Sequence, residues 1–166
     1  MHTNNNIVTD KLTNFILIGG VGVGKTSLFN KLLNIDNEAE KTQALVYYNE
    51  KTIDTPGEYF DNPRLYSAII QTMSDIDTIL YVHPANSTER KLPHGLFQIY
   101  EYKNLVGVIS KIDLPDADVP EVENLMRDFG IDGDVFKVSI YNQKSIDELR
   151  QYLCKKKTEK QFSLST

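Results

Sequence analysis

Apolar residues occur along this chain in two alternating patterns. Short, nearly unbroken apolar runs are typical of strands buried on both faces of a parallel sheet, and such runs lie at residues 15–18, 78–82, 105–109 and 135–138. Helical spacing of apolar residues predicts helices at residues 27–33, 63–73, within 95–102, 120–129 and 145–153. Strands that alternate with helices indicate a parallel sheet.

Two further short strands break this alternation. Residues 44–48 and 51–54 are separated only by Asn49 and Glu50. Two residues cannot carry a parallel crossover, so these strands must form an antiparallel hairpin. The predicted fold is therefore α/β, with a mostly parallel sheet, one antiparallel edge strand and helices on both faces.

The two ends of the chain differ from the region between them. Residues 1–14 are rich in Asn and Thr, and we expect a flexible N-terminal extension, with a helical targeting arm as the weaker alternative. Ser145 and a glutamate three residues later form a capping-box pattern, which predicts that the last helix begins at Ser145. After Cys154 the helical spacing ends, so residues 155–166 are expected to form a flexible tail, or alternatively a basic docking tail. One domain then covers residues 15–154.

Charge and composition exclude several classes of protein. The formal net charge of -5 and the isoelectric point near 5.2 provide no basic field for nucleic acid or an anionic membrane. The single cysteine, Cys154, cannot form an internal disulfide or a thiolate metal cage, and is typical of a reducing compartment. No apolar run approaches the roughly 20 residues that span a bilayer. We therefore expect a cytoplasmic protein with neither nucleic acid nor a membrane as partner; the sequence carries no signal for its oligomeric state.

A glycine-rich loop follows the first predicted strand and opens the first helix. It matches the P-loop pattern G-x-x-x-x-G-K-[ST] in the strand, loop and helix context that this motif requires. Its residues are Gly19, Gly20, Val21, Gly22, Val23, Gly24, Lys25 and Thr26, followed by Ser27. In such loops backbone N–H groups surround the β-phosphate, the lysine neutralises β- and γ-oxygens, and the hydroxyl ligates Mg²⁺. The loop therefore predicts a nucleotide site, with Lys25 also acting in catalysis.

A second motif, DTPG at residues 54–57, ends the hairpin and resembles the DxxG switch of GTPases. Asp54 would hold Mg²⁺ through a water, and the Gly57 N–H would sense the third phosphate. Thr42 precedes the hairpin, where GTPases keep a threonine that closes on Mg²⁺ only in the triphosphate state. Thr26, Thr42 and Asp54 are thus the predicted metal ligands. The alternatives are a simple proline turn at 54–57 and a solvent-exposed loop threonine at 42.

The base of the nucleotide is predicted from the SKID sequence that follows the strand at 105–109, which resembles the [NT]KxD motif. Asp113 can accept the ring N–H and the exocyclic amine of guanine together, while the stem of Lys111 lies over the base. Adenine offers neither donor, so by analogy with sites built to hydrogen-bond their substrate the discrimination can reach roughly 10⁴-fold. Ser110 replaces the usual Asn, which also ties this loop to the P-loop, and the shorter hydroxyl is expected to weaken nucleotide affinity.

A weaker match follows the strand at 135–138. Ser139 and Ile140 stand where the fifth GTPase motif backs the base, and Ile140 replaces the usual Ala. Both are included in the predicted guanine-nucleotide site.

Several segments together resemble the ethanolamine and propanediol utilization P-loop family (EutP/PduV). They are residues 19–26, 41–44, 47–48, 53–59 and 64–68. The resemblance covers roughly residues 15–153. It implies a compact Ras-like P-loop NTPase domain, encoded beside the enzymes of a bacterial microcompartment, and a cytoplasmic or shell-associated location.

Glu58 follows the switch glycine, where many GTPases carry the Gln that orients the attacking water. The γ-phosphate would repel a carboxylate there, which predicts slow turnover. The first hypothesis is a Mg²⁺-dependent GTP-binding protein with slow hydrolysis, which acts with a microcompartment shell or enzyme partner. The second is a phosphotransferase that passes the γ-phosphoryl group to a small carboxylate such as acetate, an acetate kinase. The third is a structural module whose nucleotide never turns over.

Overall fold

The computed structural model describes residues 12–35, 46–49, 52–90, 92, 95–100 and 102–163. The strands are β1 (Phe15–Ile18), β2 (Val46–Asn49), β3 (Thr52–Asp54), β4 (Thr78–Pro84), β5 (Asn104–Ser110) and β6 (Val135–Lys137). The α-helices are α2 (Lys25–Leu33), α3 (Glu58–Asp61), α4 (Tyr66–Ser74), α5 (Val119–Asp128) and α6 (Gln143–Ser163). Two 3₁₀ helices are η1 (Pro63–Leu65) and η2 (Phe97–Tyr100).

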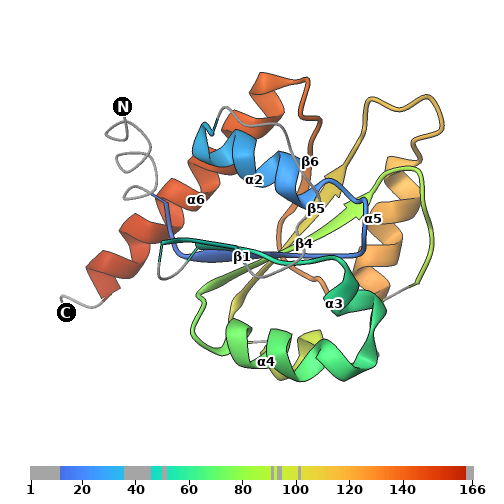
Figure 1. Ribbon diagram of the computed structural model, residues 1–166. Coiled ribbons are helices and arrows are strands. Elements are labelled where there is room, and N and C mark those ends of the chain that lie inside the picture. The colour runs from blue at the N-terminus through green and yellow to red at the C-terminus, as the bar shows by residue number, and fades with distance from the viewer. Residues whose placement is uncertain are drawn as a thin grey trace.

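The described strands form one sheet in the order β2-β3-β1-β4-β5-β6 (Figure 1). β1 lies between β3 and β4 and is parallel to both, and β5 and β6 continue the parallel arrangement. β2 pairs antiparallel with β3 at one edge. The α/β prediction of a mostly parallel sheet with one antiparallel edge strand is confirmed.

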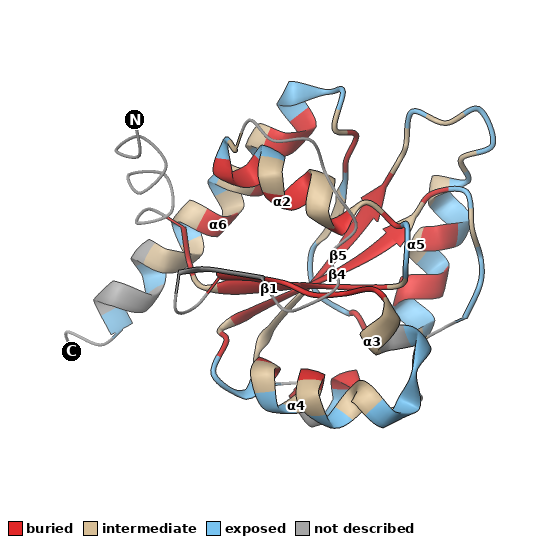
Figure 2. Cartoon of the chain, viewed as in Figure 1, coloured by how far each residue is buried: buried red, intermediate tan, exposed pale blue. Residues whose placement is uncertain are grey.

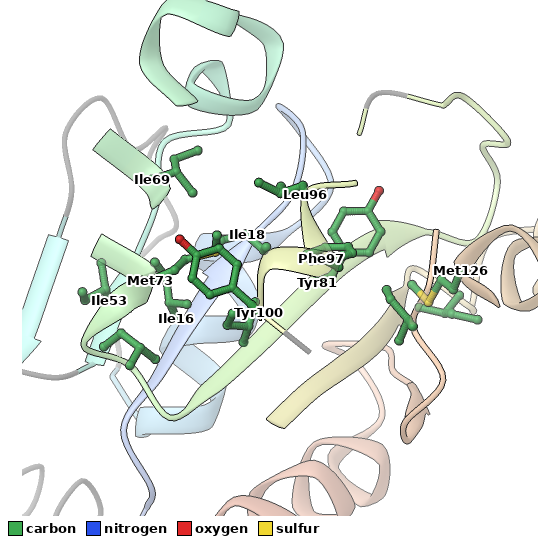
Figure 3. Close-up of a cluster of buried hydrophobic side chains, with 14 of the residues drawn as sticks. Ile16, Ile18, Ile53, Ile69, Met73, Tyr81, Leu96, Phe97, Tyr100 and Met126 are labelled. Atoms are coloured by element: carbon green, nitrogen blue, oxygen red, sulfur yellow. The ribbon is translucent and has the colours of Figure 1, made fainter. Parts of the chain in front are cut away.

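Helices cover both faces of the sheet, as predicted. α2 and α6 lie on one face, and α4 on the other (Figure 1). Every residue of β1 is buried, because apolar side chains of the FILI run enter both layers (Figure 2). Figure 3 shows the layer beneath α4, where Ile69 and Met73 pack with Tyr81 and Phe97. The rings of Tyr81 and Phe97 meet edge to face, with 5.6 Å between their centres. Burial raises the pKa of the Tyr81 hydroxyl.

The folded domain begins earlier than predicted. Leu12 and Thr13 are buried, and the Thr13 N–H donates to the Leu153 carbonyl of α6 at 3.1 Å. The Asn14 carbonyl accepts from the Thr78 N–H at 3.3 Å, at the start of β4. The predicted flexible extension is therefore wrong for residues 12–14, where backbone bonds and one apolar anchor fix the chain; residues 1–11 lie outside the described residues.

The last helix begins earlier and ends later than predicted. It starts at Gln143, because the Asn142 side chain accepts the Ser145 N–H at 3.4 Å in the manner of an N-cap. The predicted cap at Ser145 is thus wrong, and so is the predicted flexible tail for residues 155–163, since α6 continues to Ser163; residues 164–166 lie outside the described residues. Beyond its apolar stripe the helix is supported by polar contacts. Lys156 pairs with Glu159 at 3.3 Å and lies 5.4 Å from the centre of the Tyr152 ring.

The helix predicted at residues 63–73 is divided in two. The Asn62 side chain accepts the Arg64 N–H at 3.1 Å and starts η1, which passes directly into α4. In the described ranges, no helix is both long and apolar enough to cross a membrane.

Candidate nucleotide-binding site

The register of the sheet brings the predicted motifs together at the carboxyl ends of its parallel strands. Leu17 of β1 is opposite Asp54 of β3, and Pro84 of β4 is opposite Ser110 of β5. The loops that follow β1, β3 and β5 therefore leave the sheet at the carboxyl ends of parallel strands, where open α/β sheets bind their ligands.

The glycine loop between β1 and α2 depends on residues without a side chain. Gly19 has φ +149°, and a Cβ there would lie 2.3 Å from the Val82 carbonyl oxygen. Gly22 and Gly24 adopt φ +74° and +100°, which side chains disfavour. The chain can therefore wrap closely over the end of the sheet before α2 begins. The amino end of α2 adds a partial positive charge to this loop.

Lys25, in the first turn of α2, is folded back onto the loop. Its Nζ donates to the Gly20 carbonyl at 2.7 Å, and only 6% of the residue is exposed. Burial lowers the pKa of this amine to about 8, although the carboxylates of Asp54, Asp61 and Glu58 oppose the shift. A phosphate group beside Lys25 would favour its charged form.

Thr26 and Asp54 bring two oxygen ligands together. The Thr26 hydroxyl donates to Oδ2 of Asp54 at 2.7 Å, and Asp54 is 1% exposed at the end of β3. The next residue, Thr55, donates its hydroxyl to the Leu17 carbonyl at 2.7 Å and so fixes the end of β3 to β1. A hydroxyl and a carboxylate are hard oxygen donors of the kind that Mg²⁺ prefers, so this pair fits the ion.

The switch glycine lies directly against the P-loop. A Cβ on Gly57 would be 2.5 Å from Cα and 2.6 Å from N of Val21, so the backbones meet closer than any side chain would permit. Glu58 follows as the first residue of α3 and is half-buried. Thr42 lies outside the described residues, and its predicted role stays a prediction.

A cavity of about 230 Å³ adjoins the P-loop at Gly24. Its walls are Gly24, Ser27, Leu28, Ser110, Lys111, Asp113, Leu114, Val138, Ile140 and Tyr141. Asp113 and Lys111 thus share a cavity with the start of α2. The apolar walls at Leu28, Leu114 and Val138 were not predicted, since each fits the pattern of an ordinary core residue.

Two side chains tie the loop after β5 to the P-loop. The buried Ser110 hydroxyl donates to the Val23 carbonyl at 2.6 Å, so a serine ties this loop to the P-loop in place of the usual Asn. Lys111 adopts φ +58° and reaches across the cavity edge, where its Nζ donates to the Gly22 carbonyl at 2.6 Å. Hydrogen bonds therefore join the loop that carries the predicted base-binding residues to the loop that carries the predicted phosphate-binding residues.

Ser139 stands between two cavity residues but is itself buried. Its Oγ accepts the Tyr141 N–H at 3.2 Å, and its N–H donates to the Ser145 hydroxyl oxygen at 3.1 Å. The Ser145 hydroxyl donates to the Asn142 carbonyl at 2.7 Å. Ser139 and Ser145 thus fix the turn that presents Ile140 and Tyr141 to the cavity, which explains why Ser145 is not the helix cap.

The strand order and the loops at its carboxyl edge define the class of protein: this is a Ras-like P-loop NTPase with the fold of a GTPase domain. The chain belongs to the ethanolamine utilisation and propanediol utilisation family (PduV-EutP), whose model matches residues 12–155.

Several relatives of known name are similar to this chain. The probable acetate kinase EutP of Salmonella typhimurium is 44% identical over 136 residues, which cover 82% of this chain and 86% of that protein. The propanediol utilization protein PduV of Citrobacter freundii is 32% identical, over 83% of this chain and 91% of that protein. The tRNA modification GTPase MnmE of Thermoanaerobacter pseudethanolicus is 33% identical over 80% of this chain, which spans 32% of that longer protein.

Proposed function

We propose that this protein binds guanine nucleotides with Mg²⁺ and hydrolyses GTP slowly, in service of ethanolamine or propanediol utilisation. The observation that carries the proposal is the cavity that contains Asp113 and is tied to the P-loop through Ser110 and Lys111. The similarity to a GTPase supports the nucleotide, and the family supports the pathway. We place the protein in the cytoplasm, at or near the shell of a microcompartment.

In this proposal the phosphates lie between the glycine loop and the amino end of α2. Lys25 leaves the Gly20 carbonyl to neutralise β- and γ-oxygens, and its amine becomes fully charged there. Thr26, Asp54 and Thr42 would hold Mg²⁺, which neutralises charge on the phosphate oxygens. The Gly57 N–H would donate to the third phosphate.

The purine would enter the cavity beside α2. Asp113 accepts the ring N–H and the amine of guanine, Lys111 covers the base with its methylene stem, and Ile140 backs it. Leu28, Leu114 and Val138 supply apolar contact for the ring edges. With adenine the Asp113 carboxylate would face a ring nitrogen without a proton, which disfavours ATP.

Slow hydrolysis follows from the charges beside Lys25. The carboxylates of Glu58 and Asp61, both on α3 directly after the switch glycine, act on the Lys25 amine. In this proposal the third phosphate binds between Lys25 and Gly57, within reach of these carboxylates. Their charges oppose the γ-phosphate and provide no neutral donor and acceptor to position a water.

The second candidate function is phosphoryl transfer to a small carboxylate such as acetate, which the name of the 44% identical EutP favours. The same P-loop would hold the donor nucleotide. Glu58 and Asp61 weigh against this candidate, because an anionic acceptor that approaches the γ-phosphate would meet both charges.

One experiment separates these functions. The purified protein is incubated with γ-labelled GTP or ATP, with and without acetate and Mg²⁺, and labelled phosphate and acetyl phosphate are separated. We expect slow, Mg²⁺-dependent release of phosphate from GTP that acetate does not change. Labelled acetyl phosphate would establish the kinase, and tight binding without turnover would indicate a structural module. Lys25→Ala is the control that should abolish all label release.

A further inference from the structure

A tyrosine that the sequence motifs did not identify stands at the rim of the base cavity. Tyr141 contributes to the cavity wall, yet 83% of the residue is exposed, more than Tyr102 at 73%. A single exposed aromatic residue is ordinary on a protein surface. An aromatic residue that is exposed and also lines a ligand cavity has apolar surface for the ligand to cover.

Hydrogen bonds hold the backbone of Tyr141 in place, while most of the residue is exposed. The Tyr141 N–H donates to Oγ of Ser139 at 3.2 Å, and the Asn142 N–H donates to the Ser139 carbonyl at 3.0 Å. Ser139 is in turn bonded to the Ser145 hydroxyl of α6. The turn therefore fixes the position of Tyr141 at the rim and leaves most of the residue exposed to solvent or to a ligand.

We propose that the Tyr141 ring stacks on the purine of a bound guanine nucleotide and closes the mouth of the cavity. This inference rests on the proposed guanine-nucleotide binding. The cavity supplies Asp113 for the hydrogen-bonding edge of a base, and its apolar walls at Leu114 and Ile140 suit a flat ring. Tyr141 supplies an aromatic face, which attracts any purine through stacking and carries no information about its edge.

We therefore expect Tyr141 to contribute to the affinity for any purine nucleotide, and Asp113 to determine the choice of base. Base stacking on an aromatic side chain is lost on alanine substitution at a cost that corresponds to about a 5- to 150-fold loss of affinity. Tyr141→Ala should weaken GDP and IDP by the same factor within this range, mainly through faster dissociation. Tyr141→Phe should bind as the wild type does. Tyr102→Ala is the matched control, because Tyr102 precedes β5 at the opposite end of the sheet.

The chain contains no tryptophan, so Tyr141→Trp introduces a single reporter at the rim. GDP should change the fluorescence of this variant, while inorganic pyrophosphate, which has no base, should not. The matched reporter Tyr102→Trp should respond to neither.

Isothermal titration calorimetry of the full chain with GDP and IDP decides between the outcomes. Unchanged GDP affinity in Tyr141→Ala, or a fluorescence change in Tyr141→Trp that pyrophosphate reproduces, would overturn the inference while guanine binding stands. Absence of GDP binding by the wild-type protein would instead overturn the proposed function itself. A larger loss for GDP than for IDP would also refute stacking, because it would show that residue 141 reads the exocyclic amine.

Discussion

Deletion of one side-chain oxygen removes the hydrogen bond from Ser110 to the P-loop. Ser110 is 5% exposed at the end of β5, and its hydroxyl donates to the Val23 carbonyl at 2.6 Å. Ser110→Ala deletes the donor and leaves that carbonyl buried beside a methyl group. The second tie, from Lys111 to the Gly22 carbonyl, is unaffected, so the loop should loosen without detaching.

The expected cost follows from the burial of this bond. A buried polar group that loses its partner destabilises a protein by about 1–3 kcal/mol. With a urea dependence of about 2 kcal/mol per molar, this lowers the unfolding midpoint by about 0.5–1.5 M. GDP binding needs the P-loop and the loop after β5 to keep their relative positions. The increase in the free energy of unfolding that saturating GDP provides should therefore also be smaller in the variant.

Urea unfolding followed by circular dichroism, with and without GDP, measures both effects. Ser74→Ala is the matched control, since the Ser74 hydroxyl donates to the Gln71 carbonyl at the same 2.6 Å but in an exposed position, and its midpoint should stay within the equivalent of about 0.5 kcal/mol. Equal shifts for Ser110→Ala and Ser74→Ala, or an unchanged increment from GDP, would refute the view that the buried tie joins the base and phosphate loops.

Three further outcomes are expected at the same site. Because burial lowers the pKa of Lys25 to about 8 in the nucleotide-free protein, and phosphate favours its charged form, GDP affinity should be flat below that pH and fall by up to tenfold per pH unit above it. Calorimetry at pH 7, 8 and 9 checks this. The Lys25→Arg variant, whose side chain stays charged, should lack this fall in GDP affinity. Asp113→Asn should bind XDP more tightly than GDP in the same calorimeter, because the carboxamide can donate to the carbonyl that xanthine has in place of the amine; unchanged GDP affinity would exclude Asp113 as the base reader. Glu58→Gln should raise the single-turnover rate of GTP hydrolysis about tenfold, which requires only about 1.4 kcal/mol, whereas a loss of activity would identify Glu58 as a working base.

Local signals in the sequence were sufficient for the sheet and for the P-loop. The FILI run of β1 appears with the predicted boundaries, and the short link between residues 48 and 51 predicted the antiparallel hairpin because two residues permit no other connection. The base and switch motifs also follow the strands as expected. These features depend on residues close together in the chain.

The features that were missed depend on contacts between distant segments. Ser145 has the pattern of a cap, but its hydroxyl bonds to the turn at Ser139 instead. Thr13 has no pattern of its own and is fixed by the Leu153 carbonyl. Tyr141 lies at the cavity only because the turn after β6 is folded against the loop after β5. Periodicity along one segment carries no information about such partners.

The P-loop has two neighbours that are attached to it in different ways. Ser110 bonds to it through a buried hydroxyl, and Gly57 meets Val21 by close backbone packing. Removal of the Ser110 hydroxyl leaves the Val23 carbonyl without that donor in a buried position. Thr55 is fixed to β1 by its hydroxyl, so movement in the switch must begin after that residue. We therefore expect Ser110→Ala to weaken GDP and GTP by the same factor, because the response to the third phosphate resides in the segment that begins at Pro56.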